Sequence, residues 1–540
     1  MDKKPCFKRF GTMLDCSRNA VMSVKSVKRW IDLTADLGYN AVLLYIEDTF
    51  EVDDNPYFGY MRGRYTKEEL KELDRYAREK GMELIPCTQT LAHLNAIVRW
   101  PAYSPHVDTG DILLAGDEAV YGLIDKMFAS LSECFASRVI NVGMDEAHMI
   151  GRGKYYDLHG DSNRSQILLD HLNRVAQIGK KYGFTLEMWS DMFFELAAGS
   201  YYNADASINP EVGKQIPDNV RLIYWDYYST DKSRYDRMIG AHKKIKADTG
   251  FAGGFWTWEG FTPHNGYSML ATEAAVKSCL ENGIEEVFFT MWGDDGGECS
   301  KYAMLPTLFY AAQLARGNQD MEDIKRGFQE KFGIAFDDFM LLDLPGTPGG
   351  IAEKVINPEK YLLYNDCFTG LMDSTLSGGE NEQYKACAEK LAPLTADPQW
   401  GTLFGYVHAL CEVLSVKAEL GAKTHEAYKS GDRLVVSVLL ADYEELLEKL
   451  NLFYHAYKKQ WFSENKPHGF DVQDIRLGGL IMRTKTWMER LKQYADGEID
   501  VIEELEEKQL DFMGGNEKFG KEHVLFNSWR NIVTANVMAW

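Results

Sequence analysis

The stretch Val139-Ile140-Asn141-Val142-Gly143-Met144-Asp145-Glu146 has the pattern of a short buried strand that ends in two acidic residues. Seven similar apolar, β-rich runs occur within the first 320 residues, and segments with helical spacing fill most of the gaps between them. The predicted strands are residues 10–16, 41–46, 83–88, 139–144, 185–189, 221–227, 254–258 and 286–292. Eight strands that alternate with helices predict an α/β fold, a parallel (β/α)8 TIM barrel.

Glycines punctuate the segments between these strands. Helices are predicted at residues 27–37, 67–80 and 166–182, and each is followed by a glycine that suits the end of a helix. The structural alternative is a doubly wound open sheet. Such a sheet usually carries a glycine-rich turn after its first strand, and Gly11-Thr12-Met13-Leu14 is not one.

The pattern changes after the predicted barrel. Valine- and isoleucine-rich runs give way to helical repeats, in which Leu403, Val407, Leu410 and Leu414 share one helix face. We therefore predict a catalytic barrel over residues 1–320 and an all-α C-terminal domain over residues 321–540.

Composition excludes several classes of partner. The 540 residues include 59 Lys and Arg against 81 Asp and Glu, a formal net charge of −22. An acidic surface repels phosphate, so neither nucleic acid nor an anionic membrane is an expected partner. No apolar run reaches the length of a membrane span, and no signal peptide is visible. We expect a cytoplasmic protein, with a signal trimmed from the chain as the alternative.

The cysteine pattern gives no support for a metal or a disulfide framework. The nine cysteines are scattered, and none forms a Cys-x-x-Cys pair or a Cys/His cluster with zinc spacing. Reduced thiols are expected, with no metal and no organic cofactor.

Polar and aromatic residues gather at the carboxyl ends of the predicted strands, where a barrel of this type carries its chemistry. Nearly every strand delivers a carboxylate or an indole there: Asp15 and Arg18, Glu47 and Asp48, Gln89 and His93, Asp145 and Glu146, Trp189 and Asp191, Tyr224 to Tyr227, Trp258 and Glu259, and Trp292 with Asp294 and Asp295. Carboxylates can bind sugar hydroxyls, and indoles can stack on sugar rings. Each residue alone also fits a structural role in the core, in a helix cap or in an ion pair.

The adjacent Asp145 and Glu146 are the most informative pair. Both side chains enter one pocket only if the chain bends after residue 144. Crowded carboxylates raise one another's pKa, so that one of them can act as an acid near neutral pH. Taken alone, the pair fits a catalytic and a structural interpretation equally well.

The sequence resembles glycoside hydrolase family 20, the β-N-acetylhexosaminidases, over residues 6 to 320. Gly143-Met144-Asp145-Glu146 with Ala147-His148 resembles the family's catalytic Gly-x-Asp-Glu motif, and Leu14-Asp15-Cys16-Ser17-Arg18 resembles its first-strand motif. Further residues match the family's pocket positions strand by strand: Glu47, Asp48, His93, Trp189, Tyr224, Asp226, Trp292 and Asp294. The chain is most similar to the bacterial branch that has a helical C-terminal domain and no accessory domain before the barrel.

The sequence also departs from the family pattern. Met144 stands where many relatives have a second glycine, and Asp294 stands where many have glutamate. The second change puts in question the contact of Asp294 with O4 and O6 of the sugar.

The resemblance implies an exo-acting enzyme that removes terminal β-GlcNAc, with GalNAc as a second sugar, by a retaining, substrate-assisted mechanism. Glu146 would be the acid and base, Asp145 would orient the acetamido group, and Tyr224 would donate a hydrogen bond to its oxygen. Arg18 would bind the hydroxyls of the terminal sugar. Trp189, Trp258 and Trp292 would enclose the sugar.

Two other interpretations remain open at this stage. One is a catalytically silent sugar-binding barrel, against which the retained pair Asp145 and Glu146 argues. The other is a retaining glycosidase with a carboxylate nucleophile, for which Glu259 is the candidate. The expected partner is a GlcNAc-terminated oligosaccharide, and a homodimer through the helical domain is a further expectation.

Overall fold

The computed structural model describes residues 6–205, 208, 210–348, 355–514 and 524–538. The chain divides into two compact units. Unit 1 comprises Met1–Phe255, Ser268–Trp292 and Leu308–Gln319, and unit 2 comprises Trp256–Tyr267, Gly293–Thr307 and Asp320–Trp540. The domain boundary predicted at residues 320 and 321 stays a prediction, because compactness alone does not show that a part folds independently.

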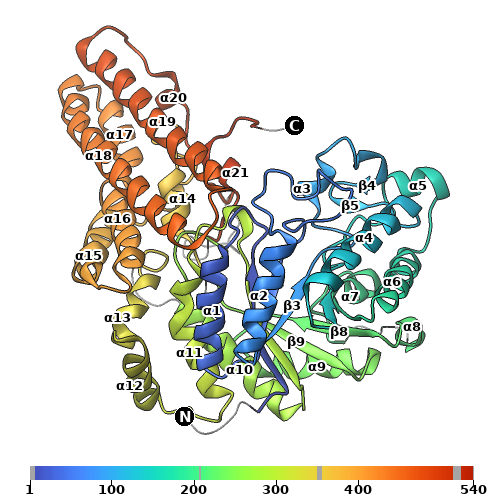
Figure 1. Cartoon of the computed structure of the whole chain (residues 1–540). Helices are drawn as coiled ribbons and strands as arrows, with labels where there is room; N and C mark the ends of the chain where they lie inside the picture. Colours follow the sequence, from blue (N-terminus) through green and yellow to red (C-terminus); the bar gives the residue numbers. More distant parts are fainter. Residues whose placement is uncertain (1–5, 206–207, 209, 349–354, 515–523, 539–540) are drawn as a thin grey trace. The chain divides into compact units, whose positions relative to one another are not determined.

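Unit 1 contains a closed barrel of parallel strands (Figure 1). Its strands are β1 (Arg9–Asp15), β2 (Ala41–Tyr45), β3 (Glu83–Cys87), β6 (Val139–Asn141), β7 (Thr185–Trp189), β8 (Val220–Trp225), β9 (Thr249–Gly254) and β10 (Glu286–Met291). Around the barrel they follow the order β1-β10-β9-β8-β7-β6-β3-β2. The predicted (β/α)8 fold is therefore confirmed.

Helices alternate with these strands along the chain. They are α1 (Val24–Asp36), α2 (Lys67–Glu79), α3 (Asn95–Val98), α4 (Glu118–Cys134), α5 (Lys154–His159), α6 (Arg164–Lys181), α7 (Asp191–Ala198), α8 (Pro210–Gln215), α9 (Lys232–Ile245), α10 (Asn265–Glu281) and α11 (Leu305–Leu314). A small antiparallel sheet of β4 (Val107–Thr109) and β5 (Ile112–Leu113) lies between β3 and α4 in the sequence.

The helix ends follow local sequence signals. Thr66 caps α2 and forms a capping box with Glu69, and Ser23 and Asn163 cap α1 and α6 with their side chains. The predicted helices begin up to three residues later than the observed ones, because the cap residue rather than the first apolar residue sets the start.

One strand prediction was wrong in position. The seventh strand was expected at residues 254–258, but β9 covers Thr249–Gly254. Glycines weaken the β signal of this strand, yet they are needed there: a Cβ on Gly253 would lie 2.8 Å from the ring of Phe289. Trp256 and Trp258 therefore follow the strand, within the segment Trp256–Tyr267 of unit 2.

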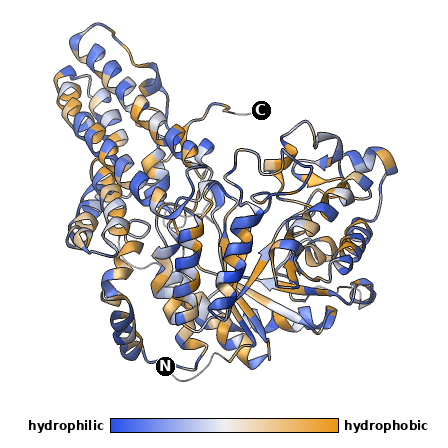
Figure 2. Cartoon of the chain, in the orientation of Figure 1, coloured by the Kyte–Doolittle hydropathy of each residue, from blue (hydrophilic) through white to orange (hydrophobic). Residues whose placement is uncertain are grey.

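Unit 2 is helical, as predicted. It contains α12 (Met321–Phe332), α13 (Phe336–Met340), α14 (Pro358–Tyr364), α15 (Glu380–Leu391), α16 (Gly401–Lys417), α17 (Leu420–Lys429), α18 (Arg433–Glu464), α19 (Phe470–Asp496), α20 (Glu503–Glu506) and α21 (Trp529–Val533). The apolar repeat of α16 is buried, and hydrophobic and hydrophilic residues alternate around the long helices (Figure 2).

Two further observations concern membrane-spanning helices and disulfide bonds. Within the part of the chain that the structure describes, no helix has both the length and the apolar character needed to cross a membrane. All nine cysteines lie within the described residues, and each is a free thiol.

Candidate active site

The chain turns sharply where β6 ends. Met144 and Glu146 have positive φ angles of 70° and 52°, which are uncommon for non-glycine residues and cluster at functional sites. Gly143 also has a positive φ, and a Cβ there would lie 1.9 Å from the side-chain oxygen of Gln89. This bend brings both carboxylates to one histidine: His93 Nε2 lies 3.2 Å from Asp145 Oδ2 and 3.4 Å from Glu146 Oε2.

Asp145 is buried and held from two sides. Gln89 donates from Nε2 to Asp145 Oδ1 over 2.7 Å, and His93 lies against the other carboxylate oxygen. Burial acts to raise the pKa of Asp145, but the charge of His93 and the hydrogen bonds hold it below its ordinary value. Burial acts to lower the pKa of His93, but Asp145 raises it to about 10. At neutral pH the two therefore form an ion pair.

Glu146 has a different environment. Its side chain is 48% exposed, so its carboxyl group can exchange protons with solvent or substrate. Its backbone N–H donates to Asp191 Oδ2 over 2.8 Å, and Trp225 Nε1 donates to Asp191 Oδ1 over 3.3 Å. The two adjacent acids thus differ: Asp145 is buried and charged, and Glu146 faces outward on a backbone held by Asp191.

Asp191 should make the stability of the fold depend on pH. Burial, reinforced by the nearby charge of Asp145, raises the pKa of Asp191 to about 8. The folded state therefore favours neutral Asp191. Its contribution is complete below the ordinary pKa of about 4 and is lost as the pH rises through about 8. Asp191→Asn cannot ionise, so its unfolding temperature should fall less between pH 6 and pH 9 than that of the wild type. Calorimetry across this range tests the expectation, and parallel curves for the two proteins would contradict it.

Arg18 lies between two carboxylates and two aromatic rings. Its Nη1 donates to Asp15 Oδ2 over 3.1 Å, and its Nη2 lies 3.4 Å from Glu47 Oε1. The guanidinium carbon lies 4.8 Å from the ring centre of Tyr45 and 5.0 Å from that of Trp292. These contacts fix the plane of the guanidinium group, which is the condition for directed binding of a sugar diol.

Asp48 belongs to a separate ion pair. Arg62 donates from Nη2 to Asp48 Oδ1 over 3.1 Å and from Nε to Oδ2 over 3.3 Å. Arg62 also donates to the backbone oxygen of Ser17, next to Arg18. The two acids after β2 therefore have different partners: Glu47 pairs with Arg18, whereas Asp48 pairs with Arg62.

Tyr224 and Asp226 form a buried pair at the end of β8. The Tyr224 hydroxyl donates to Asp226 Oδ2 over 2.9 Å, and Arg234 donates to the same oxygen over 2.8 Å. A tyrosine has a single O–H proton. For Tyr224 to donate to a substrate, its hydroxyl must therefore turn away from Asp226.

Two tryptophans meet across the barrel. The rings of Trp189 and Trp292 lie 6.1 Å apart, and the edge of Tyr45 packs on Trp292 at 4.8 Å. The buried Nε1 of Trp189 has no hydrogen-bond partner within the described residues. A buried donor without a partner is costly, and a ligand oxygen would satisfy it.

Trp258 and Asp294 lie in unit 2. Trp258 stacks on Trp256 at 4.3 Å, and its backbone oxygen accepts a hydrogen bond from Asn527. Asp294 is exposed and follows Gly293 in the segment Gly293–Thr307. The assignment of both residues to the sugar site stays a prediction.

Some residues at the site had no role in the sequence-based assignment. They are Tyr45, Arg62, Gln89 and Asp191. Gln89 and Asp191 were noted among the polar residues at strand ends, but they received no role there. No comparable signal marks Arg62, which reaches Asp48 from a loop. Among the described residues, no group of three or more His, Cys, Asp or Glu side chains could hold a metal ion.

Two family models match long parts of this chain. The family described as glycosyl hydrolase family 20, catalytic domain, matches residues 7–238. A second, the glycoside hydrolase 20C C-terminal domain, matches residues 337–524. The chain belongs to glycoside hydrolase family 20. The family-20 catalytic match contains the bend with Asp145 and Glu146, and the second match covers most of the helical region.

Curated relatives share part of their length with this family-20 chain. It is 26% identical over 246 residues to hexosaminidase D of Bos taurus. The matched segment covers 41% of this chain and 62% of that protein. It is 23% identical over 205 residues to hexosaminidase D of Homo sapiens, covering 35% and 39%. The chain thus matches less than two thirds of the length of these relatives.

Solved structures of similar proteins include the β-N-acetylhexosaminidase of Bacteroides fragilis, with a TM-score of 0.46 and 20% identity over 61% of this chain and 71% of that one. The GH20 exo-β-N-acetylglucosaminidase of Vibrio harveyi, in complex with N-acetylglucosamine, has a TM-score of 0.46 and 14% identity over 63% and 59%.

Proposed function

We propose that this chain is an exo-acting β-N-acetylhexosaminidase that removes terminal β-GlcNAc, and also β-GalNAc, from oligosaccharides with retention of configuration. The observation that carries the proposal is the pair of adjacent acids with opposite environments at one histidine. The names of the family-20 relatives support the choice of an N-acetylhexosamine as the sugar.

The first step would use the acetamido group of the substrate as the nucleophile, as the family does in place of a second catalytic carboxylate. Its oxygen would form a bond to C1 while the bond from C1 to the leaving oxygen breaks and Glu146 gives its proton to that oxygen. Asp145 would accept the acetamido N–H. Because His93 keeps Asp145 ionised, the carboxylate would also stabilise the positive charge that develops on the oxazolinium ring.

The second step would reverse the proton transfer. Water would attack C1 from the face that the leaving group vacated, and Glu146 would take the proton from that water. The bond between C1 and the acetamido oxygen would break, which releases the β-anomer of the sugar. Burial of Asp145 and exposure of Glu146 support this division of roles.

Glu259 is a poor alternative nucleophile. Burial, together with the charge of Asp294, raises the pKa of Glu259 to about 8 despite the opposing effect of Lys360. Its carboxyl group is therefore mostly protonated at neutral pH, whereas a nucleophile must be ionised. This environment favours substrate assistance over a covalent glycosyl-enzyme.

The function is tested with three aryl glycosides and one inhibitor. Release of chromophore from aryl β-GlcNAc and aryl β-GalNAc is expected, with little release from aryl β-glucoside, which has no acetamido group. A thiazoline analogue of the oxazoline intermediate should bind far more tightly than free GlcNAc, by a factor of about 10² or more. Comparable hydrolysis of the glucoside, or inhibition no better than by GlcNAc, would count against the mechanism.

Arg18 should close the site behind the terminal sugar. Arg18→Lys keeps the positive charge but loses the two parallel N–H donors of the guanidinium group. The value of kcat/KM on aryl β-GlcNAc should therefore fall by about 10- to 100-fold, which corresponds to the loss of one charged hydrogen bond. Product sizes from a chito-oligosaccharide test the same contact, because hydroxyls bound to Arg18 leave no room for a further sugar. Near-wild-type kinetics, or early products of intermediate length, would show that Arg18 does not form this end of the site.

A further inference from the structure

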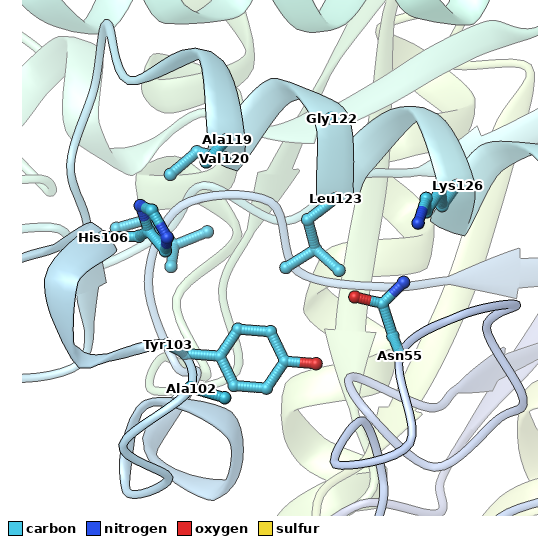
Figure 3. A pocket seen from close by; sticks show the side chains of 10 residues that line it. Asn55, Ala102, Tyr103, His106, Ala119, Val120, Gly122, Leu123 and Lys126 are labelled. Carbon is cyan, nitrogen blue, oxygen red and sulfur yellow. The ribbon is translucent and has the colours of Figure 1, made fainter.

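A pocket in unit 1 is lined by residues other than those described above. It is a pocket of about 320 Å³ between the loop after β2, the loop after β3 and the first turns of α4 (Figure 3). Leu113, Val120 and Leu123 provide apolar walls, and the ring of Tyr103 lies among them. In Figure 3 the side chains of Asn55 and Lys126 lie at one side of the pocket, and His106 lies at the other.

A cluster of aromatic rings, two of them exposed, lies close in the sequence to residues that line this pocket. Tyr57 and Tyr60 are 44% and 42% exposed, and their rings lie 5.6 and 5.5 Å from that of Trp100. Tyr57 is two residues from Asn55, and Trp100 is two residues from Ala102, and both Asn55 and Ala102 line the pocket. Aromatic rings that remain this exposed on a soluble protein are typical of binding surfaces.

The polar groups of the pocket suit hydroxyls. Asn55 uses its Nδ2 on the backbone oxygen of Asp53, which leaves its side-chain oxygen as an acceptor. Within the described residues the Tyr103 hydroxyl forms no hydrogen bond, and His106 uses only Nδ1, on Asp117. Donors and acceptors beside flat apolar surfaces are the combination that recognises a sugar.

An anion is a less suitable occupant. Lys126 Nζ lies 3.6 Å from a carboxylate oxygen of Asp54, so the charge of this lysine is already offset by the protein, and Asp117 already occupies Nδ1 of His106 at 2.7 Å. The net charge of −22 disfavours an anion further. A volume of about 320 Å³ is at the small end of the range for ligand pockets and suits one or two neutral sugar rings.

The pocket is linked to the candidate active site through one loop. The segment after β3 carries His93, which contacts Glu146, and then continues to Trp100 and Tyr103. Asp111, next to β5, accepts a hydrogen bond from the backbone N–H of His93, and Leu113 in β5 donates to Leu91. The proposed leaving group begins at Glu146, so the aglycone starts beside this loop.

We propose that the pocket and its aromatic rim, formed by Tyr57, Tyr60 and Trp100, bind a neutral sugar residue of the aglycone, at a distance from the scissile bond. This inference rests on the proposed function, because an aglycone exists only if the chain cleaves glycosides. It predicts an enzyme that prefers oligosaccharides of GlcNAc to aryl glycosides, which are too short to reach the pocket.

The test compares two substrates in three variants. Trp100→Ala removes the ring that both tyrosines contact, and Ala119→Trp fills the pocket from the exposed face of α4. The control is Tyr156→Ala, which removes a similarly exposed tyrosine from α5. In both test variants, the ratio of kcat/KM on chitotetraose to kcat/KM on aryl β-GlcNAc should fall about tenfold, and the control should keep the wild-type ratio. An unchanged ratio in both test variants would overturn the proposal.

A binding experiment separates this inference from the proposed function. Two ligands, chitotetraose and GlcNAc, are titrated calorimetrically. Each is titrated into the wild type at low temperature and into Glu146→Gln. Both proteins are measured with and without the additional substitution Ala119→Trp. The affinity for chitotetraose should fall about tenfold with Ala119→Trp, and the affinity for GlcNAc should not. If the wild type hydrolyses no N-acetylhexosaminide, the proposed function fails, but loss of chitotetraose binding in Ala119→Trp still supports the sugar pocket. Equal chitotetraose affinity with and without Ala119→Trp overturns the pocket, whatever the activity.

Discussion

Glu146→Gln is expected to lower kcat on oligosaccharides by roughly 10²–10⁴, the usual contribution of general acid catalysis. The amide keeps the shape of the side chain but has no proton to give to a leaving oxygen. An aryl glycoside with an acidic phenol needs little protonation, so its kcat for the first step should fall much less. Steady-state kinetics on a series of aryl β-GlcNAc substrates with graded phenol pKa values measure this difference.

The leaving-group series also provides the control. In the wild type the rate should depend weakly on the phenol pKa, and in Glu146→Gln it should depend strongly, because the acid no longer compensates for a poor leaving group. An equal loss on good and poor leaving groups would show that Glu146 is not the acid. Unfolding temperatures should be nearly unchanged, since this side chain is half exposed.

Asp145→Asn is expected to lower kcat by about 10²–10³, the range found when one preorganised electrostatic group is removed from a site. The substitution removes the negative charge that would stabilise the oxazolinium ring. It also turns an acceptor of the acetamido N–H into a side chain that can present an N–H of its own. The loss should be similar for good and poor leaving groups, which distinguishes it from the loss in Glu146→Gln.

The same variant should change the titration of His93. Asp145 is the main group that raises the pKa of His93 to about 10, and burial opposes it. In Asp145→Asn the pKa of His93 should therefore fall, so that the ring loses its proton at a lower pH than in the wild type. NMR titration of the histidine ring measures the shift, and an unchanged His93 pKa would contradict the ion pair.

Asp74→Asn is the matched control. Asp74 is also a buried aspartate, but it lies on α2, where it pairs with Arg78 and accepts a hydrogen bond from the backbone of Ala136. Its replacement should lower stability and leave kcat and the pKa of His93 near their wild-type values. A similar loss of kcat in both variants would point to a general effect on folding.

Local sequence patterns were sufficient to predict the barrel architecture and to identify the polar residues at the strand ends. Alternation of apolar runs with helical segments predicts the barrel, because each strand and helix is encoded within a few neighbouring residues. The same reasoning placed the seventh strand at residues 254–258, where large apolar residues are, although β9 is Thr249–Gly254. Glycine in β9 is required by Phe289 of the neighbouring strand, a contact that is invisible in local sequence.

By itself, the sequence determined that Asp145 and Glu146 stand together at the end of one strand, and that Arg18, Glu47 and His93 follow the ends of three other strands. Only the tertiary structure decided the pairing among them. Arg18 contacts Asp15 and Glu47, whereas Asp48, the residue next to Glu47, pairs with Arg62. Asp191 supports the backbone of Glu146 across 45 residues of chain. The physical reason is that adjacent residues at a strand end point in different directions, and barrel closure alone sets which distant side chains each direction meets.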